Sequence, residues 1–324
     1  MGGGRVVGLL LVAATLTVAV ACTSSDDSAG SDRDDEGTVD GGLTVDPVGR
    51  FGIPADETPP GLQLCAVEGP STSAGGAQAA LYGEVDREDP YAGPMLGVLW
   101  GPADEVDHAG DGESAPVTVR GTAGVVAPIT VFQQTVLPEL GTVVAWREAG
   151  LSVGLYGRLW SPDRSDDLVA LADALTFADG LFQLPHDALP AGYGLVYLGS
   201  AASMSLLLPL ETDYRVLYRT GEGEGTGVVS VYGLAGTVEE FEAFRFLALD
   251  LSEADVHGVE MLTGNAWGDS GPAVATWREP DGRILRIVGT GVDLPVITEL
   301  AQFTRQLTPD EWSDLEAAVT PCSD

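Results

Sequence analysis

One serine stands in a loop that could carry nucleophilic chemistry. Ser270 lies in the Gly-Asp-Ser-Gly-Pro segment 268–272, where glycine leaves backbone N–H groups free to hold an oxyanion. A serine nucleophile also needs a histidine to take its proton and a carboxylate to orient that histidine. The chain has three histidines, His108, His186 and His257. His257 precedes Ser270 by thirteen residues, in a predicted strand.

The 268–272 loop resembles the nucleophile loop of trypsin-like serine proteases, which implies Ser270 as the nucleophile. No histidine stands in the family's Ala-Ala-His-Cys context, and Pro272 replaces the second glycine of the usual ending. A Gly/Asp/Ser turn before a strand is also what turn chemistry alone produces. The matching place in the first half, 137–141, is an ordinary connector. We assign no catalytic residue, and a serine hydrolase using Ser270 remains the alternative function.

An acidic loop offers hard oxygen ligands that could hold Ca²⁺ at extracellular concentrations. Its candidate ligands are Asp104, Glu105, Asp107, His108, Asp111 and Glu113. Their spacing does not match an EF-hand, and such clusters in acidic proteins are usually solvated. We expect no metal site and no cofactor.

The first residues have the pattern of a secretion signal. Arg5 gives a positive start, and the apolar run 6–21 is shorter than the about 20 residues that a membrane-spanning helix needs. Ala19-Val20-Ala21-Cys22 resembles the lipobox of bacterial lipoproteins, which implies that Cys22 becomes the lipidated first residue of the mature protein. The same small residues also fit cleavage of a plain secretory signal at the same bond.

The number of cysteines favours the lipid anchor. If Cys22 carries lipid, Cys65 and Cys322 remain as an even pair, as an oxidising compartment favours. We therefore predict a Cys65–Cys322 disulfide. Without lipid on Cys22, an odd thiol is left over.

The charge of the chain excludes several classes of partner. Its 324 residues carry 49 acidic and 15 basic side chains, all of the latter arginine, for a net charge of −34. Such a chain repels nucleic-acid phosphates and anionic lipid headgroups. Its 44% hydrophobic content can fill a core. The acidic, Gly/Ser-rich residues 22–48 are predicted to form a disordered tether.

The rest of the chain contains an internal repeat. Strands ending in Trp-Arg-Glu occur around Trp146 and Trp277, 131 positions apart, and each is followed by a glycine turn and a returning strand. Further matches keep the same order: 60–65 with 190–196, 95–101 with 228–233, and 117–121 with 255–258. The two tryptophans could be ligand-stacking platforms, but equivalent strand positions in a repeat are usually packed. We predict packing.

Each returning strand precedes a predicted helix. Ser161-Pro162 would cap a helix with Leu168, Leu171, Ala172 and Leu175 on one side. In the second copy the apolar stripe is Val296, Ile297, Leu300, Ala301 and Phe303. Capping boxes at Thr237 and Thr308 predict two more helices. The fold class is therefore α+β, with two tandem duplicated lobes, each an antiparallel sheet with a packed C-terminal helix.

The domain organisation and function follow from these patterns. We expect a signal peptide over 1–21, the tether over 22–48, one lobe over 49–180 and its repeat over 181–324. Strand, Trp-x-Glu, glycine turn, strand and amphipathic helix resemble the end of small extracytoplasmic domains in actinobacterial lipoproteins and anti-sigma-factor-linked sensors, over about 35 residues per copy. This resemblance implies non-catalytic sensing or binding of a small molecule or an envelope protein, at the extracytoplasmic face of the cell membrane. A structural envelope protein is a further alternative.

Overall fold

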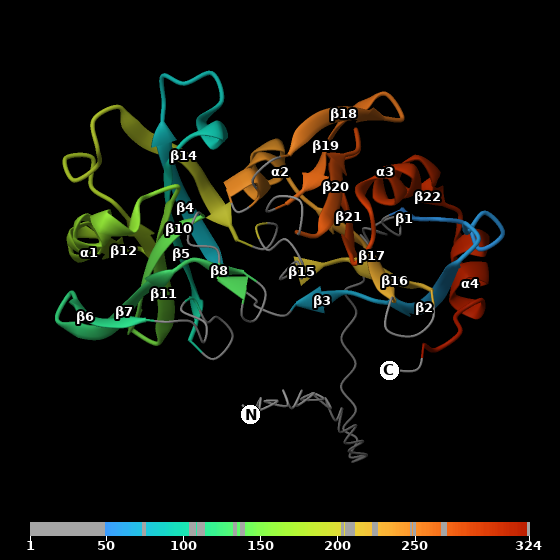
Figure 1. The fold of residues 1–324 in the computed structure, drawn as a ribbon, viewed down its shortest axis with the longest axis horizontal. Coiled ribbons are helices and arrows are strands. Elements are labelled where there is room, and N and C mark those ends of the chain that lie inside the picture. The colour runs from blue at the N-terminus through green and yellow to red at the C-terminus, as the bar shows by residue number, and fades with distance from the viewer. Residues whose placement is uncertain are drawn as a thin grey trace, which may run out of the picture. The chain divides into compact units, whose positions relative to one another are not determined.

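The fold is mixed but mostly β, with two seven-stranded antiparallel sheets and a few short helices (Figure 1). This agrees with the coarse α+β prediction. No helix in the part of the chain that is described is long and apolar enough to span a membrane. The computed structural model describes residues 49–72, 76–103, 108, 114–131, 135–136, 140–201, 204, 211–221, 226–246, 248, 251–266 and 271–322.

The first sheet has the strand order β14-β4-β5-β11-β10-β7-β6. Its strands are β4 (Gln78–Glu84), β5 (Met95–Pro102), β6 (Ala115–Val119), β7 (Thr122–Pro128), β10 (Gly141–Glu148), β11 (Leu151–Arg158) and β14 (Tyr193–Ser200). Strands β10 and β11 form the predicted Trp-Arg-Glu hairpin, in which Trp146 is paired with Val153. Their near-continuous apolar sequence fits strands that are buried on both faces.

The second sheet has the strand order β2-β16-β17-β21-β20-β19-β18. Its strands are β2 (Leu62–Glu68), β16 (Tyr214–Thr220), β17 (Gly227–Ala235), β18 (Ser252–Val256), β19 (Val259–Asn265), β20 (Ala273–Arg278) and β21 (Arg283–Thr290). Here the corresponding hairpin is β20–β21, in which Trp277 is paired with Leu285. Read from β14 and from β2, the two orders correspond strand by strand.

The two sheets exchange their first strands. Strand β2 belongs to the first half of the sequence but is paired with β16 in the second sheet. Strand β14 belongs to the second half but is paired with β4 in the first sheet. The predicted boundary at residue 180 therefore does not separate the sheets in space, because each sheet takes an edge strand from the other segment. The short strands β3 (Ser71–Thr72) and β15 (Glu211–Thr212) follow the exchanged strands and are paired with each other.

Local irregularities recur at matched places in the two sheets. Strand β14 has a bulge at Val196, and β2 has one at Cys65, between residues that are paired with corresponding positions of β4 and β16. The hairpins β6–β7 and β18–β19 turn through Arg120-Gly121 and His257-Gly258, and all four residues have positive φ. Two consecutive positive φ angles are the geometry of the two-residue hairpin turn that matches strand twist. His257 thus lies in a turn, and its prediction as a strand residue was wrong.

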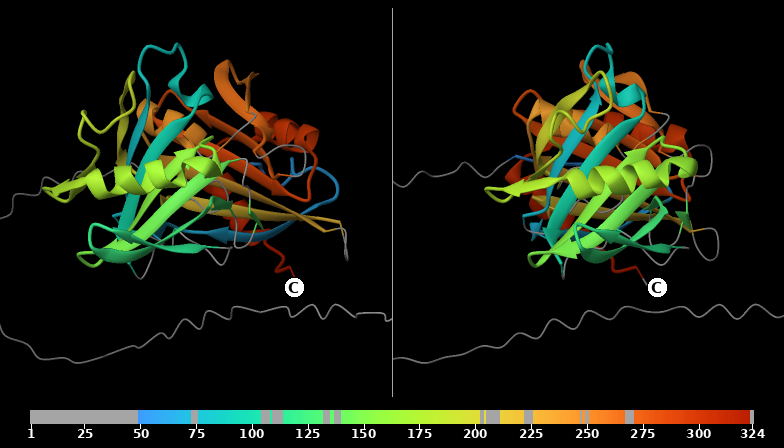
Figure 2. Two further views of the ribbon diagram at one scale, coloured as in Figure 1. Left: turned by 60° about the vertical axis from the view of Figure 1, so that its left-hand side comes forward. Right: turned by 90° about the vertical axis from the view of Figure 1, so that its left-hand side faces the viewer.

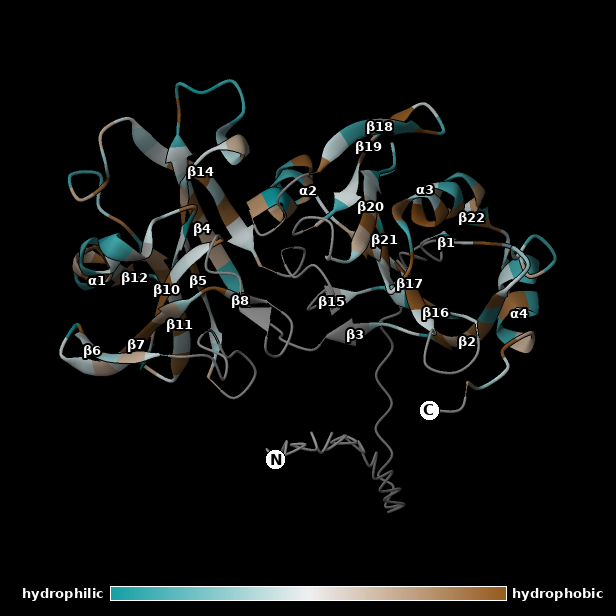
Figure 3. Ribbon diagram, in the orientation of Figure 1, coloured by the Kyte–Doolittle hydropathy of each residue, from teal (hydrophilic) through white to brown (hydrophobic). Residues whose placement is uncertain are grey.

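A helix packs on one face of each sheet. Helix α1 (Ser165–Ala174) buries Leu168, Leu171 and Ala172 as predicted, and α3 (Leu294–Phe303) buries Ile297, Leu300 and Ala301. The predicted start at Ser161-Pro162 was wrong, because Pro162 opens a 3₁₀ turn, η3 (Pro162–Arg164), before α1. Val296 and Phe303 remain partly exposed rather than buried. Both helices carry hydrophobic and hydrophilic residues (Figure 3).

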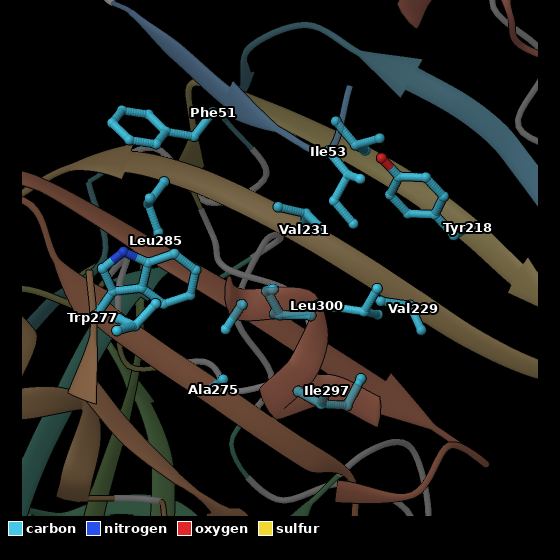
Figure 4. Close-up of a cluster of buried hydrophobic side chains, with 14 of the residues drawn as sticks. Phe51, Ile53, Tyr218, Val229, Val231, Ala275, Trp277, Leu285, Ile297 and Leu300 are labelled. Atoms are coloured by element: carbon cyan, nitrogen blue, oxygen red, sulfur yellow. The ribbon is translucent and has the colours of Figure 1, made fainter. Parts of the chain in front are cut away.

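The core of the second sheet lies beneath α3 (Figure 4). Ile297 and Leu300 of the helix pack with Trp277, Leu285 and their neighbours from the sheet. The corresponding core of the first sheet combines α1 with Trp146, Trp160, Phe182 and further aliphatic side chains. Burial of these side chains from water is the main favourable contribution to the stability of each sheet and its helix.

A helical segment contacts the opposite faces of both sheets. It consists of α2 (Val238–Ala243), opened by the predicted capping box at Thr237, and the 3₁₀ turn η5 (Phe244–Phe246). Phe246 packs in the cluster of the first sheet, and Phe244 packs in a cluster of the second sheet. Gly97 on β5 leaves room for the Phe246 ring, which a Cβ atom there would overlap. A 3₁₀ turn of the first segment, η1 (Pro90–Ala92), lies near η5, because Asp89 directly before η1 pairs with Arg245 of η5.

Small ladders and a last helix complete the described fold. The ladders pair β1 (Arg50–Gly52) with β22 (Arg305–Leu307), β12 (Thr176–Ala178) with β13 (Leu181–Gln183), and β8 (Thr130–Val131) with β9 (Thr135–Val136). Helix α4 (Pro309–Ala317) follows β22 and has the predicted capping box at Thr308. No helix follows β12 before β13, so α4 has no counterpart in the first segment. Figure 2 shows the two sheets and their helices from two further sides.

Candidate functional site

Several residues singled out from the sequence lie outside the described residues. These are Cys22, Ser270 and the carboxylates of the acidic loop, Asp104, Glu105, Asp107, Asp111 and Glu113. The signal peptide and tether lie outside them as well. Among the residues that are described, no group of His, Cys, Asp and Glu side chains could hold a metal ion.

Two histidines of the proposed hydrolase chemistry use Nε2 as a donor. His108 is buried, with Nε2 3.3 Å from the carbonyl oxygen of Ser152 and Nδ1 3.0 Å from the hydroxyl of Tyr156. Nε2 of His257 lies 3.0 Å from the carbonyl oxygen of Gln302. A carbonyl oxygen only accepts, so each Nε2 carries a proton. A general base needs an unprotonated nitrogen facing the nucleophile, and Nε2 of neither histidine meets that need.

The two tryptophans of the repeat are packed, as predicted. Trp146 and Trp277 have exposed fractions of 3% and 0%. Each indole N–H donates to the carboxylate two residues later on the same side of its strand, Trp146 to Glu148 at 3.1 Å and Trp277 to Glu279 at 2.8 Å. The Trp-x-Glu pattern thus satisfies a buried donor at the end of a strand, and neither ring offers a stacking surface.

The carboxylate of Glu148 pairs with Arg120 in the β6–β7 turn, with Nε 2.8 Å from Oε2. The hydrogen bond from Arg120, helped by that from Trp146, holds the pKa of Glu148 below its ordinary value. The ion pair therefore joins the turn of the edge hairpin to the central hairpin.

A buried arginine joins the first sheet to η5. Nη1 of Arg158 donates to the carbonyl of Arg245 at 3.1 Å, and Nη2 donates to the carbonyls of Tyr91 and Gly93. Burial lowers the pKa of Arg158 to about 10. Arg245 in turn pairs with Asp89. Because Arg158 binds backbone carbonyls from two segments, we assign it a structural role.

A hollow of about 340 Å³ lies beside α4. It is lined by Gly49, Arg50, Gln306, Leu307, Thr308, Pro309, Trp312, Ser313 and Glu316. Its charged groups contact one another: Arg50 lies over the Trp312 ring and 3.6 Å from Glu316, whose carboxylate also accepts the Trp312 indole N–H. The volume is at the lower end of the range for small-molecule pockets.

The edge of the second sheet at β2 is covered by the chain itself. The backbone N–H of Thr320 donates to the carbonyl of Leu64 at 3.0 Å, and the Gln63 side chain donates to the carbonyl of Thr320 at 3.2 Å. Cys65 and Cys322 form the predicted disulfide, with Cα atoms 5.1 Å apart. Helix α4 lies alongside, and its Trp312 and Leu315 join the core of this sheet (Figure 1). As a result, Leu64 is only 8% exposed.

The matched edge of the first sheet at β14 is not covered in this way. Strand β14 has β4 as its single strand neighbour within the described residues. Leu195 occupies the position that Leu64 has in β2, since both precede the bulge and face matched tyrosines across the ladder, yet Leu195 is 50% exposed. Leu198 is 39% exposed, and Val85, which packs over Gly194, is 56% exposed. These three side chains and β14 make up what we term the β14 edge.

Acidic side chains of α2 lie near the β14 edge, on the face of the sheet opposite Leu195 and Leu198. Tyr197 is buried on that face, and burial together with Glu240 and Glu239 of α2 raises its pKa. At the start of β14, Glu84 is paired in the ladder with Tyr193, and Arg87 forms an ion pair with Glu84.

Sequence reasoning did not find the β14 edge. It matched residues 60–65 with 190–196, which lie in and just before strands β2 and β14, but it made no prediction of which of them is covered. Nothing in that pattern distinguishes a leucine covered by a later helix from one left at a free edge. The absence of an α4 counterpart after β12 was the one usable sign.

The chain was also compared with known proteins. No protein-family model matches it, and no curated protein matches it. Among solved structures, it is similar to the apo immunity protein TplEi of the type VI secretion system of Pseudomonas aeruginosa, with 14% identity, a TM-score of 0.21, and coverage of 84% of this chain and 93% of that one. A crystal structure of MucB in complex with MucA(peri) aligns with 13% identity, a TM-score of 0.16, and coverage of 73% and 95%. At these TM-scores neither transfers a fold or a function.

Proposed function

We propose that this is a lipid-anchored protein of the extracytoplasmic face that acts by binding another envelope protein, not by catalysis. The observation that carries the binding role is the β14 edge, which leaves Leu195 and Leu198 exposed on one face of the sheet and Val85 on the other, where the matched strand β2 is covered. Exposed apolar side chains that cluster on a rigid element are characteristic of interaction sites.

The proposed compartment is supported by the cysteines. The Cys65–Cys322 disulfide supports maturation in an oxidising environment, where such bonds form and persist. Its formation leaves Cys22 as the remaining cysteine, at the position where the lipobox resemblance requires one. The acidic residues 22–48 would then hold the folded part away from the anionic membrane surface by repulsion.

Metabolic labelling with an alkyne fatty acid tests the anchor. The full-length protein should incorporate label and fractionate with membranes, and Cys22→Ser should lose both properties. A protein that is exported and cleaved but carries no label in either form would mean a plain secretory signal.

Photo-crosslinking on membranes tests the binding role. Amine-reactive reagents are unsuitable because the chain has no lysine. We would place p-benzoylphenylalanine at exposed positions on separate elements, Leu198 on β14, Val238 on α2 and Val296 on α3. A discrete crosslinked protein from at least one position is expected. The absence of a protein adduct from every position would contradict a protein-binding role.

We also propose that residues 49–180 and 181–324 are duplicates of one ancestral unit, each an antiparallel sheet followed by a packed helix. The corresponding strand orders, the matched bulges at Cys65 and Val196, and the two Trp-x-Glu hydrogen bonds support this origin. Exchange of the first strands would then descend from a strand-swapped dimer, a low-cost route to association. A solved relative with one such unit per chain, assembled as a swapped dimer, would test this.

A further inference from the structure

The two sheets have four edge strands, and three of them are protected. Strand β2 is covered by the segment that contains Thr320 and Cys322. Strand β6 contains Pro116, which cannot donate to an added strand, and β18 contains Glu253 and Asp255. Covering chain, proline and charge are the devices by which proteins prevent edge pairing.

The fourth edge, β14, has no such protection among the described residues. Its sequence, Tyr-Gly-Leu-Val-Tyr-Leu-Gly-Ser, contains neither a charged residue nor a proline. Leu195 and Leu198 project to the same face of the sheet, because the bulge at Val196 shifts the alternation between them. Val85 packs over Gly194 and leaves a further exposed apolar side chain on the opposite face of this edge.

We propose that the β14 edge binds an extended segment of a partner protein, which adds to the first sheet as an eighth strand. This inference rests on the proposed function, since it names the surface and the kind of segment by which the partner is bound. The matched edge shows that chain outside the sheet can bond there: the backbone N–H of Thr320 donates to the carbonyl of Leu64 in β2.

The chemistry of the edge specifies the segment. Backbone N–H and C=O groups supply the affinity of strand addition, and alternate side chains supply the specificity. The segment should place two apolar side chains over Leu195 and Leu198, and on its other face a basic side chain toward Glu239 and Glu240 of α2.

Two other occupants fit this edge less well. A second copy of the chain would bring another net charge of −34 against the first. The chain's own residues 22–48 are acidic and poor in large apolar side chains, so they match neither the leucines nor the glutamates of α2.

A synthetic peptide tests strand addition directly. The probe is a ten-residue peptide of alternating valine and threonine with two lysines at one end and a fluorophore at the other, titrated against the full mature chain and followed by anisotropy. A control peptide has the same sequence with alternate backbone amides N-methylated, which removes the donors on one side. We expect the first peptide to bind and the control peptide to bind at least about tenfold more weakly. Equal binding of the two peptides, or no binding of the first at millimolar concentration, overturns strand addition.

Variants locate the site. Leu195→Lys/Leu198→Lys should weaken peptide binding about tenfold or more, because both leucines lose their apolar contacts. Val296→Lys on α3 removes an apolar side chain about as exposed as Leu198, on a helix that packs on the other sheet, and should leave binding unchanged. Circular dichroism checks that all variants fold. Unchanged binding by the β14 variant overturns the assignment.

The same variants separate this inference from the proposed function. Sedimentation of the wild type should give a monomer, and a concentration-dependent dimer that Leu195→Lys/Leu198→Lys abolishes would replace the partner with a second copy and overturn the proposal. In the crosslinking experiment on membranes, adducts from Val238 or Val296 but none from Leu198 would retain the protein-binding role and reject the β14 edge as its site. Adducts from no position would reject both.

Discussion

Strands β2 and β14 hold the same place in their sheets, with the bulge at the same point and matched tyrosines on the neighbouring strand. They differ in what lies outside them. Helix α4 and the residues around Thr320 cover β2, whereas among the described residues no helix lies between β12 and β14 to cover β14. The two sheets thus share a strand order and differ in the element that covers the first strand. The difference turns one of two similar strands into a candidate binding surface.

The largest losses of stability should come from substitutions at the tryptophans that the two sheets share. Trp146→Ala and Trp277→Ala should each lower the free energy of unfolding by about 3–5 kcal/mol, because each removes a buried ring. Urea denaturation followed by circular dichroism measures this. Trp146→Phe and Trp277→Phe are the controls, which keep most of the apolar volume and lose the hydrogen bond to Glu148 or Glu279. A large cost at one tryptophan only would show that the sheets are not energetically equivalent.

The covalent tie at β2 should give the next largest effect. Cys65→Ser/Cys322→Ser should lose about 2–5 kcal/mol of stability, on a model in which the bond limits the unfolded chain. It should also release the segment around Thr320, which faster hydrogen exchange of the Thr320 amide would detect, because that N–H donates to the carbonyl of Leu64. The matched variant Val196→Ser on β14 changes the equivalent bulge position and serves as the reference. Equal stability with and without the disulfide would mean that α4 packing alone closes this edge.

A matched pair of leucines tests the difference in cover directly. Leu64→Ala should cost about 2–3 kcal/mol, because α4 and its neighbours enclose this side chain. Leu195→Ala should cost no more than about 0.5 kcal/mol, because half of that side chain is already exposed. Chemical denaturation of the two variants side by side gives the comparison. Similar costs at both positions would show that β14 is covered in solution.

The smallest effect concerns the Arg120–Glu148 pair of the first sheet. The pKa of Glu148 is lowered in the folded protein, so its contribution is present above its ordinary value of 4.5 and is lost as the pH falls through the lowered pKa. Glu148→Gln should therefore reduce the melting temperature at pH 7 by about 2 °C, and the difference should vanish at low pH. Calorimetry of both proteins from pH 7 down to pH 3 measures this. A difference that persists unchanged to pH 3 would assign the effect to the Trp146 hydrogen bond.

Local features of this fold could be predicted from the sequence. These features are the capping boxes at Thr237 and Thr308, the packing of the repeated tryptophans and the cysteine pair. Each depends on a few residues whose side chains have one favourable arrangement. Spacing of apolar residues also identified the buried sides of α1 and α3, apart from Val296 and Phe303.

The exchange of strands could not be predicted. In a repeated sequence, β2 resembles β14, and both suit the edge beside β4 as well as the edge beside β16. The hydrophobic pattern and the β propensity then favour pairing within a segment and pairing across segments equally. The choice depends on which edge the connecting loops allow each strand to reach. The exposure of Leu195 depends on this choice of pairing and on which edge α4 covers. It therefore could not be predicted from the sequence either.

The strand exchange also sets an order of events for the growing chain. Leu62 in β2 finds its partner, Thr220, only 158 residues later, and β4 waits for β14 from beyond residue 192. Loop closure over such distances slows folding, because the entropy of a long loop is lost before its contacts form. Neither sheet can close until most of the chain has emerged. During that interval β2 has no strand partner and β4 is paired on one side only, and this is when the protein is most exposed to aggregation and proteolysis.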